Sequence, residues 1–369
     1  MVLPSRKRRC RDLGSAAAAT KTSTIAVSPP ADVIFEILSW LPTKSLGRCR
    51  CVSKKWLDLI SNPGFVAAHR SRAESLLVAM TDHSVHPRCL QLMDTDGTLV
   101  RVLSLPGAWW FHASLDGLAY ITFRKRNSVT HAVVDLATGV TLTDLRKQPV
   151  MEYYMLTYMG FGRTARSGVY KLLRLKGGAN ERQTCEVLTV GDDTDWRQTQ
   201  PTPMIVCQSY ACPGVALNGV FHFLSRDENR VLCFNLDSEE WKVIHGPQGG
   251  VIRVKEPISI AQLDGTLCIA QMEPHMINIW LLSDSENNVW VKAYAIPTRR
   301  KVVKYVLPLR VLHLGGGLLF FYAGNNLKPK LQVYNRRLRR CTTVKTPNNL
   351  LGRISLCNGD LYPRFCDQP

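Results

Sequence analysis

Apolar residues recur at helical spacing in one short stretch near the start of the chain, and at strand spacing along most of the remaining sequence. In the helical stretch, which begins after Pro29 and Pro30, apolar residues lie three or four positions apart. They are Ile34, Ile37, Leu38 and Leu41. A helix would gather them on one face, so the pattern predicts an amphipathic helix that packs on other helices or on a partner.

Local signals set the limits of the predicted helices. Asp32 is a candidate N-cap, and Pro42 is expected to end the first helix, because the residue before a proline is disfavoured in the α conformation. A second short helix is expected over residues 44–50, and a third around Trp56 that stops at Asn62-Pro63-Gly64. Helices this short bury little surface, so the pattern alone leaves open whether they cover the rest of the chain or a partner.

Beyond residue 73 the sequence has the texture of strands, with short apolar runs separated by Gly, Pro, Asn and Asp. Three turns between such runs carry pairs typical of hairpins with positive φ: Asp116-Gly117, Asn218-Gly219 and Asp264-Gly265. Units of about four strands that repeat at roughly 40–50 residues favour a β-propeller over a sandwich. The expected fold class is therefore α + β, with a small three-helix module followed by a mainly antiparallel β domain.

Composition bounds the function. The chain has 369 residues, 45% of them hydrophobic, which suffices for a small module and one large domain. Its formal net charge of +18 favours acidic partners. Residues 1–27 read as a disordered basic tail, in which the run Arg6–Arg11 is either a nuclear localisation signal or solvated charge.

The most apolar later run, residues 311–323, contains His313 and three glycines, so it predicts a buried hairpin and not a membrane span. The cysteines are scattered as small hydrophobic residues without Cys-x-x-Cys spacing. We expect a protein with reduced thiols, located in the nucleus, the cytoplasm or both, with no membrane partner.

No arrangement of residues indicates catalysis. The best metal candidate is His83-x-x-His86-x-x-Cys89, but Pro87 disrupts a helix there and no fourth ligand has a recognisable spacing, so a polar linker is preferred. The glycines after His313 lack a Gly-x-Ser-x-Gly elbow, and Gly160-x-Gly162 lacks the third glycine of a dinucleotide site. We expect no enzyme activity, no cofactor and no metal.

Two groups of side chains are candidates for binding. The first is a basic cluster between two apolar runs, expected to form a hairpin turn: Arg336, Arg337, Arg339 and Arg340. It is either solvated or captures an acidic or phosphorylated segment of a target, because arginine pairs with carboxylates and phosphates in a bidentate manner. The second is a set of tryptophans near predicted strand ends, expected to pack between blades, with ligand stacking as the alternative: Trp196, Trp241, Trp280 and Trp290.

The helical module, residues 28–72, resembles the F-box along its whole length. The matching residues are Leu41-Pro42, Lys44-Ser45-Leu46, Arg48, Cys51-Val52-Ser53-Lys54, Trp56, Leu59-Ile60, Pro63 and Phe65. The resemblance implies docking on the Skp-type adaptor of cullin–RING ubiquitin ligases, through Pro30, Ile34, Ile37, Leu38, Leu41, Pro42, Ser45 and Leu46. It assigns the core of the module to Val52, Trp56, Ile60 and Phe65.

The module departs from the F-box pattern at three positions. Pro29 stands where the family usually has leucine, Trp40 where arginine is common, and Gly47 where leucine is common. A glycine inside a helix costs roughly 1 kcal/mol relative to alanine. These three residues are candidates for weakening the adaptor interface.

The region from about residue 100 to residue 345 resembles the F-box-associated interaction domains of plants. The matching pieces are Gly160-Phe-Gly162 with Val169-Tyr-Lys-Leu172, Cys185-Glu-Val-Leu188 with Trp196-Arg197, Leu217-Asn-Gly219 with Phe234-Asn-Leu236, and Ile279-Trp280. The expected organisation is a tail (1–27), an F-box (28–72), a linker with the first strands (73–99) and a propeller-like substrate-recognition domain (100–369). Residues from 346 onward are expected to close or cap the last blade.

Together the two resemblances imply a substrate-recognition subunit of an SCF-type ubiquitin ligase. Such a subunit is not catalytic: it binds the adaptor, reaches the cullin and RING subunits through it, and holds a target protein. One alternative is an F-box scaffold that acts outside a ligase. Another is a basic nucleic-acid-binding protein, which is disfavoured because the basic residues lack interleaved aromatic residues.

Overall fold

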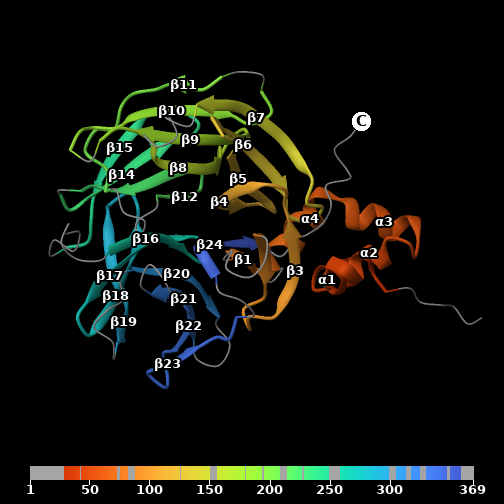
Figure 1. Cartoon of the computed structure of the whole chain (residues 1–369). Coiled ribbons are helices and arrows are strands. Elements are labelled where there is room, and N and C mark those ends of the chain that lie inside the picture. The colour runs from red at the N-terminus through yellow and green to blue at the C-terminus, as the bar shows by residue number, and fades with distance from the viewer. Residues whose placement is uncertain are drawn as a thin grey trace, which may run out of the picture.

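Four short helices precede a ring of six four-stranded antiparallel sheets (Figure 1). The structure is a computed structural model, and it describes residues 29–41, 43–72, 75–81, 88–124, 126–149, 156–178, 180–192, 195–207, 214–226, 228–248, 258–298, 305–312, 317–324, 330–346 and 350–358. The expected fold class, a helical module ahead of a β-propeller, is confirmed. The predicted tail, residues 1–27, lies outside the described residues.

The helical module contains one helix more than expected. Its helices are α1 (Ala31–Ser39), α2 (Thr43–Cys49), α3 (Lys54–Ser61) and α4 (Pro63–Arg72). Pro63 begins α4 as well as ending α3, because a proline at the first helical position loses no hydrogen bond that a helix would need. The side chain of Asn62 accepts a hydrogen bond from Gly64 N at 2.8 Å, which satisfies one of the amides in the first turn of α4.

The caps of the helices are set by the residues that precede them. Ser53 caps α3 by accepting a hydrogen bond from Trp56 N at 3.2 Å. The prediction that Asp32 caps α1 is wrong: α1 begins at Ala31, and its N-cap is Pro30, two residues before Asp32, without a side-chain cap. Asp32 lies in the first turn instead, where a carboxylate is favoured by the helix dipole.

Each of the six sheets is one blade of the propeller. The strands of each blade are given in order from the inner strand to the outer strand. The first blade contains β24 (Leu350–Asn358), β1 (Ser75–Thr81), β2 (Cys89–Met93) and β3 (Leu99–Ser104). The second contains β4 (Ala108–Leu115), β5 (Leu118–Arg124), β6 (Ser128–Asp135) and β7 (Thr141–Pro149). The third contains β8 (Leu156–Arg163), β9 (Tyr170–Lys176), β10 (Thr184–Thr189) and β11 (Arg197–Gln198).

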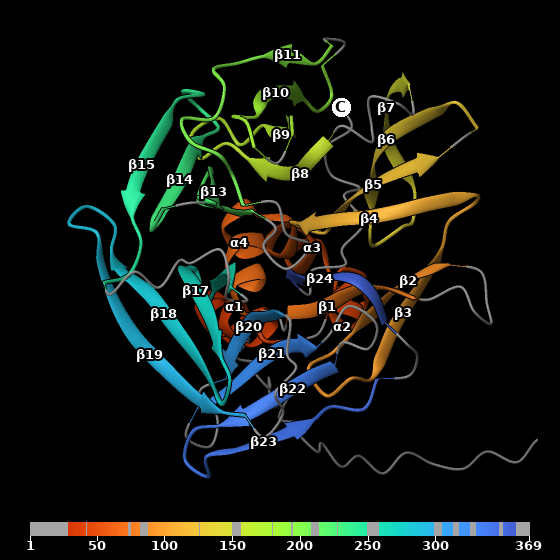
Figure 2. The same cartoon turned by 60° about the vertical axis from the view of Figure 1, so that its left-hand side comes forward.

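The remaining blades repeat this order. The fourth contains β12 (Val215–Leu217), β13 (Val220–Leu224), β14 (Arg230–Asn235) and β15 (Trp241–His245). The fifth contains β16 (Ile258–Leu263), β17 (Thr266–Glu273), β18 (Met276–Asp284) and β19 (Val289–Pro297). The sixth contains β20 (Tyr305–Leu312), β21 (Leu318–Gly324), β22 (Lys330–Asn335) and β23 (Arg340–Thr343). The inner strands of successive blades are neighbours around the axis (Figure 2).

Two strands from opposite ends of the β domain close the ring. β1 and β24 run antiparallel, from the pair Ser75–Asn358 to the pair Thr81–Leu350. β24 therefore completes the first blade, to which β1 belongs, and not the last blade as the sequence suggested, because the sixth blade already has four strands. The propeller starts at Ser75, ahead of the boundary at residue 100 that the sequence suggested, because the strands within residues 73–99 belong to this blade.

The predicted tight turns have the expected backbone. In the pairs Asp116-Gly117, Asn218-Gly219 and Asp264-Gly265, φ lies between 47° and 78° at every residue, as a two-residue hairpin turn requires. Gly160 and Gly162 in β8 are needed for a different reason, which is the limited space beside them. A Cβ on Gly160 would lie 2.7 Å from Phe221, and one on Gly162 would lie 2.7 Å from Leu236, so both glycines let the third and fourth blades approach each other.

Closure of the ring by β24 is expected to be essential for the propeller. Residues Leu350, Ile354 and Cys357 are buried, and burial of a large apolar side chain contributes roughly 1.5–3 kcal/mol. A chain that ends at Thr346 should lose its cooperative thermal transition and become sensitive to protease. A control chain that ends at Asn358 keeps every described strand and should melt as the full chain does. Equal melting temperatures for the two truncated chains would show that β24 is dispensable.

Candidate functional site

The helical module has a small core of its own. Leu38, Leu46, Ile60 and Phe65 are at most 4% exposed and form one cluster. The ring of Phe65 meets Phe35 edge to face at 5.2 Å and stacks on His69 at 6.2 Å. The Nε2 atom of His69 donates a hydrogen bond to Leu41 O at 2.8 Å, which fastens the end of α1 to α4. The module therefore carries its own packing contacts.

Apolar side chains remain on the surface of the module. The large apolar residues that stay exposed on or beside its helices are Val33, Ile37, Trp40, Val52 and Leu57. Ile37 is 57% exposed on α1, and Trp40, directly after α1, is 65% exposed. The indole Nε1 of Trp40 donates to the Glu36 carboxylate at 3.1 Å, which orients the ring along α1. Clustered apolar side chains at a surface are typical of a protein-binding face.

The residues predicted to contact an adaptor divide into three groups. Pro30 and Ile37 are exposed, and Ile34, Leu41 and Ser45 are partly exposed. All five side chains are therefore accessible to a binding partner. Leu38 and Leu46, 2% and 1% exposed, are corrected to core residues, because their side chains pack against Ile60 and Phe65. Pro42 lies outside the described residues.

One core assignment is wrong. Val52 is 63% exposed, because it lies in the turn between α2 and α3 and its side chain has no helix above it. Trp56 is half-buried against the cluster, and Ile60 and Phe65 are inside it, as predicted. Gly47 is exposed, and a Cβ there would meet no atom within 4 Å, so packing inside the module does not require the glycine.

An open cleft of about 550 Å³ lies where three turns of the second, third and fourth blades converge. Its walls include Asp116, Arg163, Arg166 and Asn218. The carboxylate of Asp116 accepts hydrogen bonds from Tyr170 at 3.1 Å and Arg163 at 3.4 Å. The guanidinium of Arg163 also donates to Gly168 O at 2.8 Å, which holds the turn of the third blade in shape. Much of the polar lining is thus engaged within the protein.

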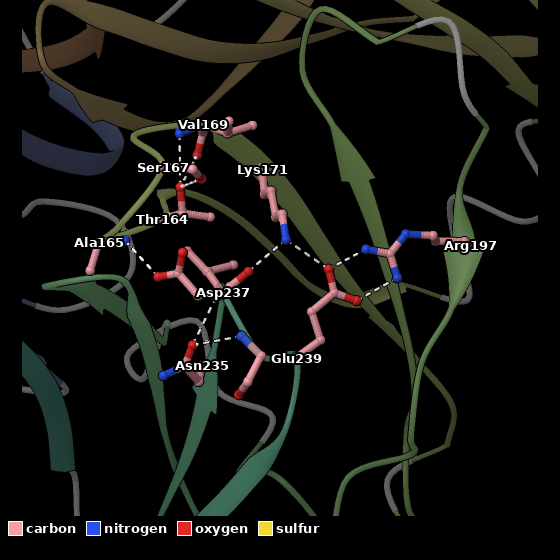
Figure 3. A network of polar contacts seen from close by, with 11 residues as sticks. Thr164, Ala165, Ser167, Val169, Lys171, Arg197, Asn235, Asp237 and Glu239 are labelled. Atoms are coloured by element: carbon pink, nitrogen blue, oxygen red, sulfur yellow. Dashed lines mark hydrogen bonds and ion pairs between the residues drawn. The ribbon is translucent and has the colours of Figure 1, made fainter.

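A polar network beside this cleft ties the third blade to the fourth (Figure 3). The ammonium of Lys171 donates to Leu236 O at 2.6 Å and to the Glu239 carboxylate at 2.7 Å. Arg197 donates to both oxygens of the same carboxylate. The Asp237 carboxylate accepts a hydrogen bond from Ala165 N at 2.8 Å. One short turn of the fourth blade therefore binds three segments of the third.

The charge state of this network is set by its partners. Burial alone would raise the pKa of the Glu239 carboxyl, but the hydrogen bonds and charges of Arg197 and Lys171 outweigh it and hold that pKa below its ordinary value. The same holds for Glu186, whose pKa is lowered despite burial by Lys176 and Arg174. Both carboxylates are charged at neutral pH and lie between blade strands, so their role is structural.

The turn that carries Glu239 belongs to a repeat that sequence reasoning missed. In five turns between a third and a fourth strand, an Asp or Asn side chain accepts hydrogen bonds from backbone amides of the turn: Asp94, Asp135, Asn235, Asp284 and Asn335. A residue with positive φ follows in each, such as Glu239 at 59° and Arg339 at 49°. The signal available in the sequence is an Asx residue at the end of five of the six third strands; β10, which ends at Thr189, lacks it.

The basic cluster forms the expected hairpin turn, between β22 and β23. The side chains of Arg336, Arg337, Arg339 and Arg340 are all exposed. The guanidinium of Arg336 lies 5.7 Å from the centre of the Tyr294 ring on the neighbouring blade. A role of these arginines in substrate binding stays a prediction.

The tryptophans pack between blades, as expected. The indole of Trp241 donates to Gln200 O at 3.0 Å and that of Trp290 to His245 O at 2.9 Å, in each case across to the preceding blade or its connection. Trp196 lies between the Arg174 guanidinium, 4.1 Å from its centre, and His131 of the second blade, 5.4 Å away. Trp280 packs against the core between the fourth and fifth blades.

Metal binding and thiol reactivity depend on the His, Cys and acidic side chains. The described residues contain no group of three or more His, Cys, Asp or Glu residues placed to hold a metal ion, and His83 and His86 lie outside them. Burial raises the pKa of the Cys185 and Cys233 thiols to about 12, so neither is a thiolate at neutral pH. Within the same described segments, no helix has the length and apolarity to cross a membrane.

Comparison with known proteins gives both parts of this architecture a family. Residues 30–67 match the F-box domain, and residues 108–345 match the F-box associated beta propeller domain. The chain belongs to the family of F-box proteins with an F-box-associated β-propeller. Among similar curated proteins from Arabidopsis thaliana, F-box protein At1g47340 is 25% identical, with 92% of this chain and 81% of the relative covered. F-box protein At5g65850 is 26% identical, with 74% and 72% covered.

The Glu239 network predicts a pH-dependent contribution to stability. Replacing Glu239 with Gln should lower the free energy of unfolding by about 1–3 kcal/mol at neutral pH, because Lys171 and Arg197 lose a charged acceptor. The folded-state pKa is lowered, so the wild-type advantage exists above the unfolded glutamate pKa and is lost as the pH falls through the folded value. Denaturant unfolding at neutral and acidic pH measures the difference.

The neighbouring Glu240 supplies the control for this experiment. It is exposed in the same turn, and Glu240→Gln should leave the stability nearly unchanged at every pH. Two results would contradict this prediction. One is a Glu239→Gln variant as stable as the Glu240→Gln variant. The other is a loss of unfolding free energy in Glu239→Gln that does not decrease at acidic pH; either would show that the charge of Glu239 does not stabilise the fold.

Proposed function

We propose that this chain is a substrate-recognition subunit of an SCF-type cullin–RING ubiquitin ligase. The observation that carries the proposal is an F-box with exposed apolar side chains on and beside α1, joined by two residues to a closed propeller. In this role the F-box binds a Skp-type adaptor, which brings the cullin and RING subunits, and the propeller binds a target protein.

The chemistry of such a complex is performed by its partners. The chain itself contributes effective concentration: a target held on the propeller keeps its lysines near a charged ubiquitin carrier, which makes the transfer step effectively intramolecular. The short junction between Arg72 and Ser75 supports this role, because a junction of two residues limits the distance between the propeller and an adaptor bound to the F-box.

Adaptor binding is tested by co-expression with a Skp-type adaptor and size-exclusion chromatography. We expect a one-to-one complex for the wild type. Ile37→Asp should weaken adaptor binding by roughly thirtyfold or more, about 2 kcal/mol, because it places a carboxylate in the centre of an apolar contact. The double variant Leu41→Ala, Pro42→Ala should also lose the adaptor.

A matched control separates the interface from general effects of the new charge. Val291→Asp introduces the same kind of charge at an apolar position of similar exposure, 50% against 57%, but on β19 of the propeller. It should retain the adaptor. A folded wild-type chain that fails to bind, or an Ile37→Asp variant that binds like Val291→Asp, would remove the interface assigned to α1. Co-purification of cullin then distinguishes a ligase subunit from an F-box scaffold outside a ligase.

A further inference from the structure

The two ends of the propeller have different relations to the F-box. Strands alternate in direction within each blade, so the turns from first to second and from third to fourth strand share one end, here called the F-box face. It carries the F-box because β1 starts at Ser75, beside Asn358 at the end of the inner strand β24. The turns from second to third strand and the connections between blades share the other end, here called the distal face.

Charge is unevenly divided between these faces. We counted charged residues in each connection, including the last residue of one strand and the first residue of the next, within the described ranges. The distal-face connections hold nine Lys and Arg residues and three Asp and Glu residues. Counted in the same way, the F-box face holds seven Lys and Arg residues and twelve Asp and Glu residues. The positive excess of the connections thus lies on the end that points away from the F-box, where it attracts acidic partners.

An aromatic anchor lies within the basic face. Trp110, near the start of the inner strand β4, is 41% exposed, although its neighbour Trp109 is fully buried. The guanidinium of Arg88 lies 4.2 Å from the centre of the Trp110 ring and donates a hydrogen bond to Trp109 O at 2.7 Å. Such an arrangement holds the Trp110 ring in place at the surface, and tryptophan and arginine are the residues that contribute most to protein interfaces.

Further cations surround this anchor and continue around the ring. Arg124 ends β5 opposite Ala108 in the sheet register, two residues from Trp110, and Arg126 is exposed in the following turn. In the next two blades the Arg226 guanidinium donates to the Asn180 side chain at 2.7 Å, which joins their distal turns. Arg182 is exposed in the turn that contains Asn180. The cations are therefore distributed over neighbouring blades and do not converge on one point.

We infer that the distal face is the surface that holds the target protein, and that its ligand is an Asp- and Glu-rich segment anchored over Trp110 and Arg88. This inference rests on the proposed function, which supplies a target to be held. A run of single carboxylates fits cations that are spaced along a surface. The bound segment would lie on the opposite end of the propeller from the F-box.

Two other anionic partners fit less well. Phosphate recognition uses several arginines that converge on one group, whereas Arg88 and Arg226 each donate to an acceptor within the protein and lie on different blades. A nucleic acid presents a continuous line of phosphates, whereas Glu181 and Glu228 interrupt the cations on these turns. A peptide segment can space its carboxylates to pass these two positions. The described part of this face also offers Trp110 as a stacking platform without a row of further exposed aromatic residues.

The test uses the full chain, with its adaptor if the two co-purify, and fluorescence anisotropy of a labelled peptide of alternating glutamate and leucine. The wild type should bind this peptide at least about tenfold more tightly than its glutamine counterpart. The double variant Arg124→Glu, Arg126→Glu and the single variant Trp110→Ala should each weaken binding by about tenfold. Unchanged thermal melting of each variant shows that the fold is retained.

The arginine turn on the F-box face supplies the matched control. Arg337→Glu, Arg340→Glu changes the net charge by the same amount on exposed side chains and should alter peptide affinity by less than about twofold. Equal losses in the two double variants would reveal non-specific attraction and overturn the inference, as would a larger loss in the control. Tighter binding of a phosphoserine peptide or of oligothymidine than of the glutamate peptide would overturn it too.

Adaptor binding provides an independent readout. The distal-face variants should keep the adaptor, since the F-box is on the other end. If the wild type binds no adaptor, the proposed function fails while the peptide experiment still decides the chemistry of this face. If the adaptor is retained but the glutamate peptide is not preferred, the ligand inference fails and the proposed function stands.

Discussion

The pairing of β1 with β24 is the contact on which the remaining architecture depends. A propeller has no covalent closure, and each blade is stabilised by packing against its two neighbours. Hydrogen bonding between a strand near the start of the β domain and one near its end joins the ring and gives β1 a partner on both sides. The F-box is attached to the same blade, because β1 comes two residues after α4. The strand that follows the F-box is thus one of the two strands whose pairing closes the ring.

Between the other blades, cohesion comes from contacts that differ from one boundary to the next. The third and fourth blades are joined by charged groups around Glu239 and by the close approach that Gly160 and Gly162 permit. The second and third meet through Trp196 and His131, and the fourth and fifth through an apolar cluster and the Trp290 hydrogen bond.

Much of the fold was predictable from local chemistry. Period-four apolar spacing located α1, and the Asp-Gly and Asn-Gly pairs located three hairpins, because positive φ restricts the residues that can occupy them. Blade number was not predictable, since the third-to-fourth turns differ in sequence and only five of the six share an Asx residue. Val52 was misplaced because a family pattern gives residue type and not exposure. Leu38 belongs to the same apolar pattern as its neighbour Ile37, and only the packing of α1 on the other helices makes Leu38 buried and leaves Ile37 exposed. The anchor at Trp110 gave no signal, as its exposure depends on the neighbouring blade.

The late position of β24 in the chain has a consequence for synthesis on the ribosome. The F-box emerges first and contains only local contacts, so it can fold while the propeller is still being made. β1 lacks its inner partner until the last strand appears, and every blade formed before then belongs to an open ring with an unpaired edge. A nascent chain therefore acquires the F-box well before its propeller is closed. Chains that stall or terminate early would retain the F-box with an exposed sheet edge, a combination that exposes them to aggregation and to quality control.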